Sequence, residues 1–293
     1  MSLQDKIRPI FKAPALSCDC HFHVFGSAEQ YPYDDSDELR YTPPFAPLDA
    51  YFTLAHRLGI ERYVFVQPSA YCRDNTCMID AMDKVNAKYG PICRGIVDVD
   101  EDIPDTELER LHAIGVRGVR INVSPIKPHE TGFADKLLTR IKLLDTRLSK
   151  IGWQLEFLLP GWLTSELMST LEKLKANFTL AHMGLFLAKE GPKQPGFLQL
   201  IDLLQNGNGR CWVKFSGVYR ISTAADFADA APMAQALIEA APDRIIWGSD
   251  YPHLHFTNKV DSVELFNLLR QWVPDDATLR QILVKNPQNL FGF

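Results

Sequence analysis

The chain has 293 residues, of which 46% are hydrophobic and 23% are charged. These proportions are close to those of ordinary globular domains and exclude an intrinsically disordered chain. The formal net charge is −5 and no long basic run occurs, which argues against a nucleic-acid partner and favours a small-molecule substrate. No segment has the apolar length that crosses a bilayer or the apolar centre of a secretory signal. We therefore expect a cytoplasmic protein with no membrane partner.

The cysteines are spread over the whole chain, at positions 18, 20, 72, 77, 93 and 211. Such a distribution does not frame a small disulfide-rich domain, so reduced thiols are expected. Cys18 with Cys20, or Cys72 with Cys77, offers metal-binding atoms, but neither pair has the repeated CxxC spacing of a structural zinc site. The favoured interpretation is that the cysteines are buried small hydrophobic residues.

Short runs rich in β-branched and aromatic residues alternate along the chain with longer segments that have helical spacing, which is typical of repeated βα units. Strands are predicted at 15–19, 62–67, 93–99, 116–123, 154–159, 178–182, 211–215 and 244–247. Helices are predicted at 48–58, 76–88, 105–114, 135–150, 164–176, 197–205, 225–240 and 260–272. A further helix is predicted at 275–284, between Pro274 and Pro287.

Most of the predicted strands are apolar on both faces, as in parallel strands covered by helices on one side and by a packed barrel interior on the other. The sequence therefore predicts an α/β fold, a (β/α)8 TIM barrel, with the extra C-terminal helix packed on its outside. No linker or change of composition divides the chain, so one domain over 1–293 is expected. The segment 26–47 is long for a loop and rich in Tyr, Pro and Asp, and we expect it to lie over the barrel mouth.

His21 and His23 are separated by one residue, so on an extended strand their side chains point to the same face. They follow the first predicted strand, at the end where barrel enzymes keep their catalytic groups. Taken alone, the spacing is weak evidence, because satisfied or surface histidine pairs are at least as common as metal-binding pairs. Their position at the end of a strand favours a role in an active site.

His182 and Asp250 stand where the sixth and eighth predicted strands end. Each has an ordinary explanation, a core histidine bonded to a carbonyl or a helix cap. Together with His21 and His23 they form a plausible ligand set for one Zn²⁺ that would lower the pKa of a bound water. Without a metal, Asp250 can take a proton from water while a histidine polarises a carbonyl. No organic cofactor is expected.

Arg120 and Arg220 follow or end predicted strands, and each guanidinium offers a bidentate fork to a substrate carboxylate. The alternatives are a structural ion pair for Arg120 and a solvated loop for Arg220, and Arg120 is the stronger candidate. Further candidates for substrate contact are Tyr41, Gln67, Ser69 and His253, with His255 beside it. His56, His112 and His129 are interpreted as ordinary surface residues.

Five segments carry a resemblance to a known family: DCHFHVFG (19–26), RYTP (40–43), GVRGVR (115–120), HMG (182–184) and WGSDYPH (247–253). Together they resemble the amidohydrolase superfamily, in its branch that contains 2-pyrone-4,6-dicarboxylate lactonase and related lactone hydrolases. The resemblance covers most of the chain. It implies that His21, His23 and His182 bind a metal or polarise a carbonyl, and that Asp250 activates water. It also implies that Tyr41, Arg120 and Arg220 contact the substrate.

The departures from this family pattern bear on the metal and on the substrate. Arg120 and Asn122 stand where dinuclear members carry a bridging carboxylated lysine, so a two-metal centre is not expected. The branch has members with zinc and members that work without it. Ile126, Leu158 and Leu185 replace polar or cationic substrate ligands of the pyrone lactonase, which makes a lactone with one anionic group, or a neutral sugar lactone, as plausible as a dicarboxylate. Lys127 partly compensates for the loss of these cationic ligands.

The sequence therefore predicts a lactone hydrolase in which water activated by Asp250 attacks the ring carbonyl. His182, with His21 and His23, would stabilise the oxyanion, and Arg120 would orient the substrate. The alternatives are a zinc-dependent decarboxylase of the same superfamily, a sugar-lactone isomerase, and a binding barrel without enzymatic activity. A homo-oligomer is compatible with the sequence, which does not define the oligomeric state.

Overall fold

The computed structural model describes residues 7–34, 41, 43–123, 133–257 and 259–293. Eight parallel strands each pair with the next along the chain, and contacts between β8 and β1, including a bridge from Phe22 to Tyr251, close the ring. The predicted (β/α)8 TIM barrel is confirmed. Within the described part of the chain, no helix is both long enough and apolar enough to span a membrane.

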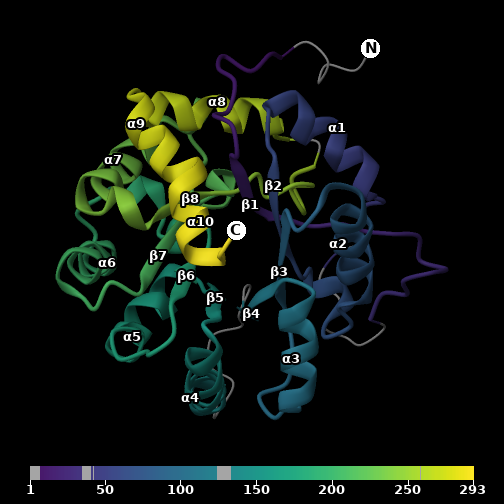
Figure 1. Cartoon of the computed structure of the whole chain (residues 1–293). Coiled ribbons are helices and arrows are strands. Elements are labelled where there is room, and N and C mark those ends of the chain that lie inside the picture. Colours follow the sequence, from purple (N-terminus) through teal and green to yellow (C-terminus); the bar gives the residue numbers. More distant parts are fainter. Residues whose placement is uncertain (1–6, 35–40, 42, 124–132, 258) are drawn as a thin grey trace.

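The strands are β1 (Cys18–Phe22), β2 (Arg62–Val66), β3 (Cys93–Val97), β4 (Val116–Asn122), β5 (Gln154–Leu158), β6 (Phe178–Leu180), β7 (Cys211–Phe215) and β8 (Ile245–Trp247). The helices of the outer ring are α1 (Leu48–Leu58), α2 (Thr76–Tyr89), α3 (Asp105–Ala113), α4 (Phe133–Ile151), α5 (Gly161–Leu171), α6 (Pro195–Asn206), α7 (Ala231–Ala240) and α8 (Ser262–Trp272). Figure 1 shows these helices arranged around the strands.

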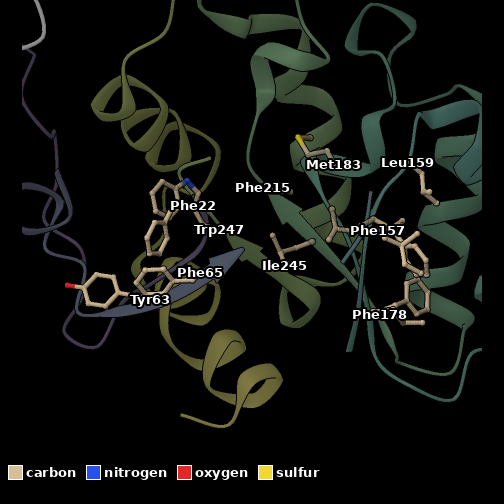
Figure 2. Close-up of a cluster of buried hydrophobic side chains, with 14 of the residues drawn as sticks. Phe22, Tyr63, Phe65, Phe157, Leu159, Phe178, Met183, Phe215, Ile245 and Trp247 are labelled. Carbon is tan, nitrogen blue, oxygen red and sulfur yellow. The ribbon is translucent and has the colours of Figure 1, made fainter. Parts of the chain in front are cut away.

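The main hydrophobic core lies between the strands and the outer helices. Side chains of a strand alternate between the two faces, and one set packs under the helices. Phe22 of β1 stacks on Tyr51 of α1 with ring centroids 3.6 Å apart, and it also contacts Phe65 of β2 at 4.5 Å. Figure 2 shows part of this layer, with Phe22 close to Phe65 and Phe157 close to Phe178. This layer attaches the helices to the barrel wall.

A smaller apolar cluster fills one end of the barrel interior. Its buried members are Cys18, Cys20, Val64, Val66, Ile96, Trp212, Ile246, Leu290 and Phe291. The interpretation of the cysteines as small buried residues is confirmed for Cys18, Cys20, Cys77, Cys93 and Cys211, whereas Cys72 is half-buried. The opposite end of the barrel is left for polar side chains.

The first strand begins later than predicted. The expected range 15–19 is wrong at both ends, because β1 runs from Cys18 to Phe22. Leu16 has a φ of 68° in a turn, and the Ser17 carbonyl accepts the backbone N–H groups of Glu61 and Arg62. His21 therefore lies inside a strand rather than after it.

Two outer helices differ from their predicted bounds. The fifth helix was expected at 164–176 but spans Gly161–Leu171, because it begins directly after Pro160 and the Thr164 hydroxyl donates back to the Pro160 carbonyl. The single helix expected at 225–240 is divided into a short 3₁₀ segment, Ala225–Ala230, and α7. Positive φ angles at Asp226 and Phe227 break the regular helix.

The C-terminal segment is longer than predicted, and its last residues enter the barrel interior. Instead of ending at 284, it continues from α9 (Asp276–Arg280) through a π-helical turn, Gln281–Lys285, into α10 (Asn286–Phe291). Pro287 lies in the first turn of α10, where its missing N–H costs nothing. Buried residues of the predicted range belong to the main core, whereas Leu290 and Phe291, which lie beyond that range, join the interior cluster. In Figure 1 α10 lies across the ring of strands.

The predicted loop at 26–47 is described only in part. Phe25 forms an antiparallel bridge with Ala46, and Tyr41 reaches the cavity described below. Several residues named from the sequence lie outside the described residues: Arg40, Thr42, Ile126, Lys127 and His129.

Candidate active site

Three imidazoles and one carboxylate converge at the carboxyl ends of the strands. His21 lies in β1 and His23 just after it, while His182 follows β6 and Asp250 follows β8. Nε2 of His21 and Nε2 of His23 lie 3.4 Å and 3.8 Å from Oδ1 of Asp250. Nε2 of His182 lies 3.9 Å from Oδ2. All four residues are at most 2% exposed. The structure thus brings together the four residues that the sequence singled out.

Two glycines leave room for this cluster. A Cβ on Gly248 would lie 2.5 Å from Cβ of His21, and a Cβ on Gly217 would lie 2.5 Å from Nδ1 of His182. His182 and Asp250 themselves have left-handed backbones, with φ of 52° and 57°. Such a conformation costs about 1–3 kcal/mol for a residue with a side chain and persists only where its surroundings hold it. The backbone N–H of Asp250 donates to the His21 carbonyl at 2.8 Å, which provides part of that support.

The hydrogen bond of His23 defines its tautomer. Its Nδ1 lies 2.7 Å from the Val66 carbonyl, which can only accept, so Nδ1 carries the proton and Nε2 presents a lone pair to Asp250. Burial, assisted by the charge of Arg120, lowers the pKa of His23 to about 4. Burial also lowers the pKa of His182 to about 3. Both imidazoles are therefore neutral at neutral pH.

The two oxygens of Asp250 have different surroundings. Oδ2 accepts the Tyr219 hydroxyl at 2.5 Å and Nε of Arg220 at 3.0 Å. Oδ1 has no hydrogen-bond partner among the described residues. Burial alone would raise the pKa of Asp250, but the charge of Arg220 holds it well below its usual value. Asp250 is thus an ionised carboxylate with one oxygen tied to the protein and the other available.

A buried ion pair lies beneath His21. Nζ of Lys214 lies 3.1 Å from Nδ1 of His21 and 2.5 Å from Oε2 of Glu156, whose Oε1 lies 3.3 Å from the same Nδ1. All three side chains are fully buried. Burial, followed by the charge of Lys214, lowers the pKa of His21 well below its ordinary value. The ring is therefore held from below by two residues of opposite charge.

The residues present fit one divalent cation. The ligand atoms of His21, His23 and Asp250 all lie within 4.8 Å of one another. Nε2 of His21 and Oδ1 of Asp250 are buried without a hydrogen-bond partner, so far as the described residues go. The lone pair on His23 faces the same carboxylate oxygen, and two acceptors in this arrangement need a cation or a proton donor between them. Two imidazoles and a carboxylate are also the ligand types of catalytic zinc sites.

A cavity of about 350 Å³ opens above this cluster. His23, His182 and Asp250 lie at its floor. Its other polar lining residues include Tyr41, Ser69, Asn122, Arg120 and Arg220, and its apolar lining residues are Leu158, Pro160, Leu185, Leu187, Leu254 and Phe256. Its volume suits a small ligand, and its floor places Asp250 next to whatever fills it.

The remaining candidates divide between this cavity and its surroundings. Tyr41 and Ser69 line it, with their hydroxyls 3.4 Å apart. Arg120 lines it and donates from Nη1 to the Gln67 carbonyl at 2.6 Å. The amide of Gln67 instead donates to the carbonyls of Cys72 and Asp74, so Gln67 shapes a neighbouring loop and does not line this cavity.

Arg220 and His253 both have partners within the protein. Arg220 lines the cavity, and its Nε donates to Asp250. His253 is not among the lining residues, and its Nδ1 lies 3.3 Å from the Tyr219 hydroxyl and its Nε2 2.7 Å from Oγ of Ser262. His255, rather than His253, lines the cavity.

Sequence reasoning missed three residues that act on the cluster: Glu156, Lys214 and Tyr219. Glu156 and Lys214 are charged residues inside otherwise apolar strands, QLEFL and CWVKF, and that contrast is a usable signal for an inward-facing ion pair. Tyr219 lies in a short 3₁₀ turn, Val218–Arg220, where no sequence periodicity marks it.

A family model described as "Amidohydrolase" matches residues 18–293. A 4-sulfomuconolactone hydrolase from Hydrogenophaga intermedia is 33% identical, covering 99% of this chain and 93% of its own. A 2-pyrone-4,6-dicarboxylate hydrolase from Comamonas testosteroni is 29% identical, covering 97% and 92%. An apo crystal structure from Agrobacterium tumefaciens superposes with a TM-score of 0.83 at 26% identity, covering 97% and 98%.

Proposed function

The chain belongs to the amidohydrolase family, and on that premise we propose that it is a hydrolase that opens the ring of a small carboxylated or sugar-derived lactone. The observation that carries the proposal is the ionised Asp250, whose free Oδ1 lies at the floor of a small cavity beside three neutral imidazoles. This arrangement supplies a base for water and donors for a developing oxyanion without any covalent nucleophile.

The proposed reaction uses one water molecule. Oδ1 of Asp250 accepts a proton as the water oxygen attacks the lactone carbonyl carbon. Nε2 of His182 can donate to the developing oxyanion when Oγ of Ser216 donates to Nδ1 of His182, 2.9 Å away. The bond from the carbonyl carbon to the ring oxygen then breaks, and the ring oxygen leaves with the proton that Asp250 had taken. The product is a hydroxy acid or its keto tautomer.

We also propose that His21, His23 and Asp250 hold one divalent cation, with zinc as the candidate. When bound, such a cation would polarise the carbonyl and make water more acidic. The Lys214 and Glu156 pair fixes the ring of His21 in either case.

Replacement of Asp250 by Asn tests the proposal. Asp250→Asn removes the base but keeps the shape of the side chain, so kcat/KM for lactones should fall by about 10³-fold. Initial rates in a pH-stat and the melting temperature should be measured together, with Asp102→Asn, at an exposed aspartate, as the control. A folded Asp250→Asn variant with undiminished turnover would rule out this role.

The competing activities differ in their products. Hydrolysis consumes one equivalent of base per ring opened, whereas a sugar-lactone isomerase forms a new lactone without net acid and a decarboxylase releases CO₂. A binding barrel would show no turnover at all. Product analysis by NMR on the same lactone panel separates these outcomes.

A further inference from the structure

The cavity above Asp250 contains one arginine, Arg120, that forms no ion pair with a carboxylate of the described residues. Arg120 is 4% exposed, and its Nη1 donates to a backbone carbonyl rather than to an acid. Its Nε has no hydrogen-bond partner, and no carboxylate lies within ion-pair distance, among the residues that the structure describes. A buried guanidinium in this state favours an anionic ligand strongly.

The second arginine of the cavity is already paired. Nε of Arg220 lies 3.0 Å from Oδ2 of Asp250, and its guanidinium carbon lies 5.8 Å from the ring centroid of Phe256. The ion pair balances its charge, and this pair must persist if Asp250 is to stay ionised. Within the described lining, Arg120 is therefore the guanidinium left without an ion-pair partner, although Glu156 and Asp250 stabilise its charge from a greater distance.

Much of the remaining lining is apolar. Five of its residues are called the leucine wall: Leu158, Leu185, Leu187, Leu254 and Phe256. Leu158 and Leu254 are each 8% exposed, so a ligand group placed against them leaves water without gaining a hydrogen bond. A carboxylate or a hydroxyl is penalised there, whereas a methyl or other hydrocarbon group is favoured.

We propose that the substrate is a lactone with a single acidic group, held by Arg120, and a hydrocarbon substituent, held by the leucine wall. The inference rests on the proposed lactonase function and narrows its substrate class. The cavity volume of about 350 Å³ suits one five- or six-membered ring with short substituents. Dicarboxylated lactones and polyhydroxylated sugar lactones fit this wall poorly.

Three 2-pyrones of equal shape test the substrate class. They carry a 6-carboxylate with a 4-methyl group, two carboxylates at positions 4 and 6, or two methyl groups at those positions. The monocarboxylate should exceed both others in kcat/KM by about 100-fold, because each competitor leaves one buried group unmatched. D-gluconolactone serves as the polyhydroxylated probe and should be the poorer substrate by a similar factor. Faster turnover of the dicarboxylate or of gluconolactone would overturn the inference.

Substitutions in the leucine wall provide a second test of the substrate class. Leu185→Arg should lower the preference for the monocarboxylate over the dicarboxylate at least tenfold, whereas Leu185→Met should leave it unchanged. Leu187 is 42% exposed, so Leu187→Lys can be accommodated if Leu185→Arg does not fold, and it should shift the preference in the same direction. An unchanged preference in a folded cationic variant would contradict the role of the wall.

Binding measurements keep this inference separate from the proposed function. Calorimetry of the wild-type protein with ring analogues that have no lactone bond, 3-methylbenzoate, isophthalate and m-xylene, should show the same order of affinity without turnover and with the Arg220–Asp250 pair intact. If no lactone is opened but the order holds, the lactonase proposal fails and the ligand class stands. If lactones are opened by Asp250-dependent turnover but the order is reversed, the substrate class fails alone.

Discussion

His21 owes its orientation to two charged residues that do not line the cavity. Lys214 and Glu156 contact its Nδ1 from inside the barrel, 3.1 Å and 3.3 Å away. Partners of this kind orient an imidazole and tune its basicity, and their loss usually costs about 10–100-fold in activity or metal affinity. We therefore regard Lys214 and Glu156 as positioning residues.

Lys214→Met should lower the free energy of unfolding by about 3–5 kcal/mol, because Glu156 is left as an unpaired buried charge. The double variant Lys214→Met/Glu156→Leu should recover most of that stability, since an apolar pair replaces the ion pair. Its kcat/KM should nevertheless stay about 10–100-fold below wild type, because His21 has lost both partners. Urea unfolding and initial rates measure the two effects.

A double variant that regains both stability and full activity would assign this pair a purely structural role.

Sequence reasoning succeeded for residues at strand ends and failed for residues inside strands. His182 and Asp250 stand out because a polar residue ends an apolar run. Glu156 and Lys214 are equally conspicuous in composition, but their meeting with His21 depends on closure of the ring, which brings β1, β5 and β7 around one interior. The spacing of residues along the chain does not predict this contact with His21.

Among the elements, the C-terminal segment departs most from expectation. From sequence alone, Pro287 predicts the end of a helix, since proline lacks an N–H and disfavours helix at the preceding residue. In the structure the π-helical turn before α10 absorbs that restriction, and the helix continues. Leu290 and Phe291 can then enter the interior cluster, a long-range contact that local propensity does not predict.

Phe291→Ala should destabilise the protein by about 3–5 kcal/mol, because a fully buried ring of the interior cluster is removed. Leu198→Ala on α6, at a residue 49% exposed, should change stability by less than about 0.5 kcal/mol. Thermal unfolding compares the two. Activity of Phe291→Ala well below its melting temperature should remain near wild type, because the cavity lies at the other end of the barrel. Equal effects of the two substitutions would show that α10 does not anchor the interior.

At the scale of the whole molecule, the barrel was predictable because all eight strand positions appear as short apolar runs. Predicted and observed strands overlap in every unit, and β7 agrees at both ends. Strand ends were less predictable, because the interior accepts polar side chains at one end only. His21 therefore lies within β1, whereas a prediction from apolar residues alone ends this strand before His21.

The stability of the molecule should fall in mild acid. Burial lowers the pKa of His253 to about 4, while an unfolded histidine titrates near 6.5. Above pH 6.5 neither state binds the proton. Below pH 6.5 His253 binds a proton in the unfolded state but not in the folded state. The free energy of unfolding therefore falls as pH decreases towards 4. His253 alone should cost about 2 kcal/mol at pH 5 relative to pH 7.

Melting temperatures measured from pH 7 to pH 5 test this dependence. His253→Gln should make the slope shallower, whatever its effect on absolute stability, while His56→Gln, at an exposed histidine, should leave the slope unchanged. Identical slopes for wild type and His253→Gln would contradict the assignment.

The leucine wall also has a consequence for what happens after the bond breaks. Hydrolysis turns a neutral ester into a carboxylate, so the product carries one more negative charge than the lactone. Of the two arginines in the described cavity lining, Arg220 is paired with Asp250, so Arg120 alone is left to hold the added charge. The α10 segment closes the other end of the barrel, so the product must leave by the opening through which the lactone entered. The negative charge formed by the reaction thus favours release of the product from the cavity. Because the leucine wall offers this charge no polar partner, the product rebinds poorly, and ring opening is hard to reverse.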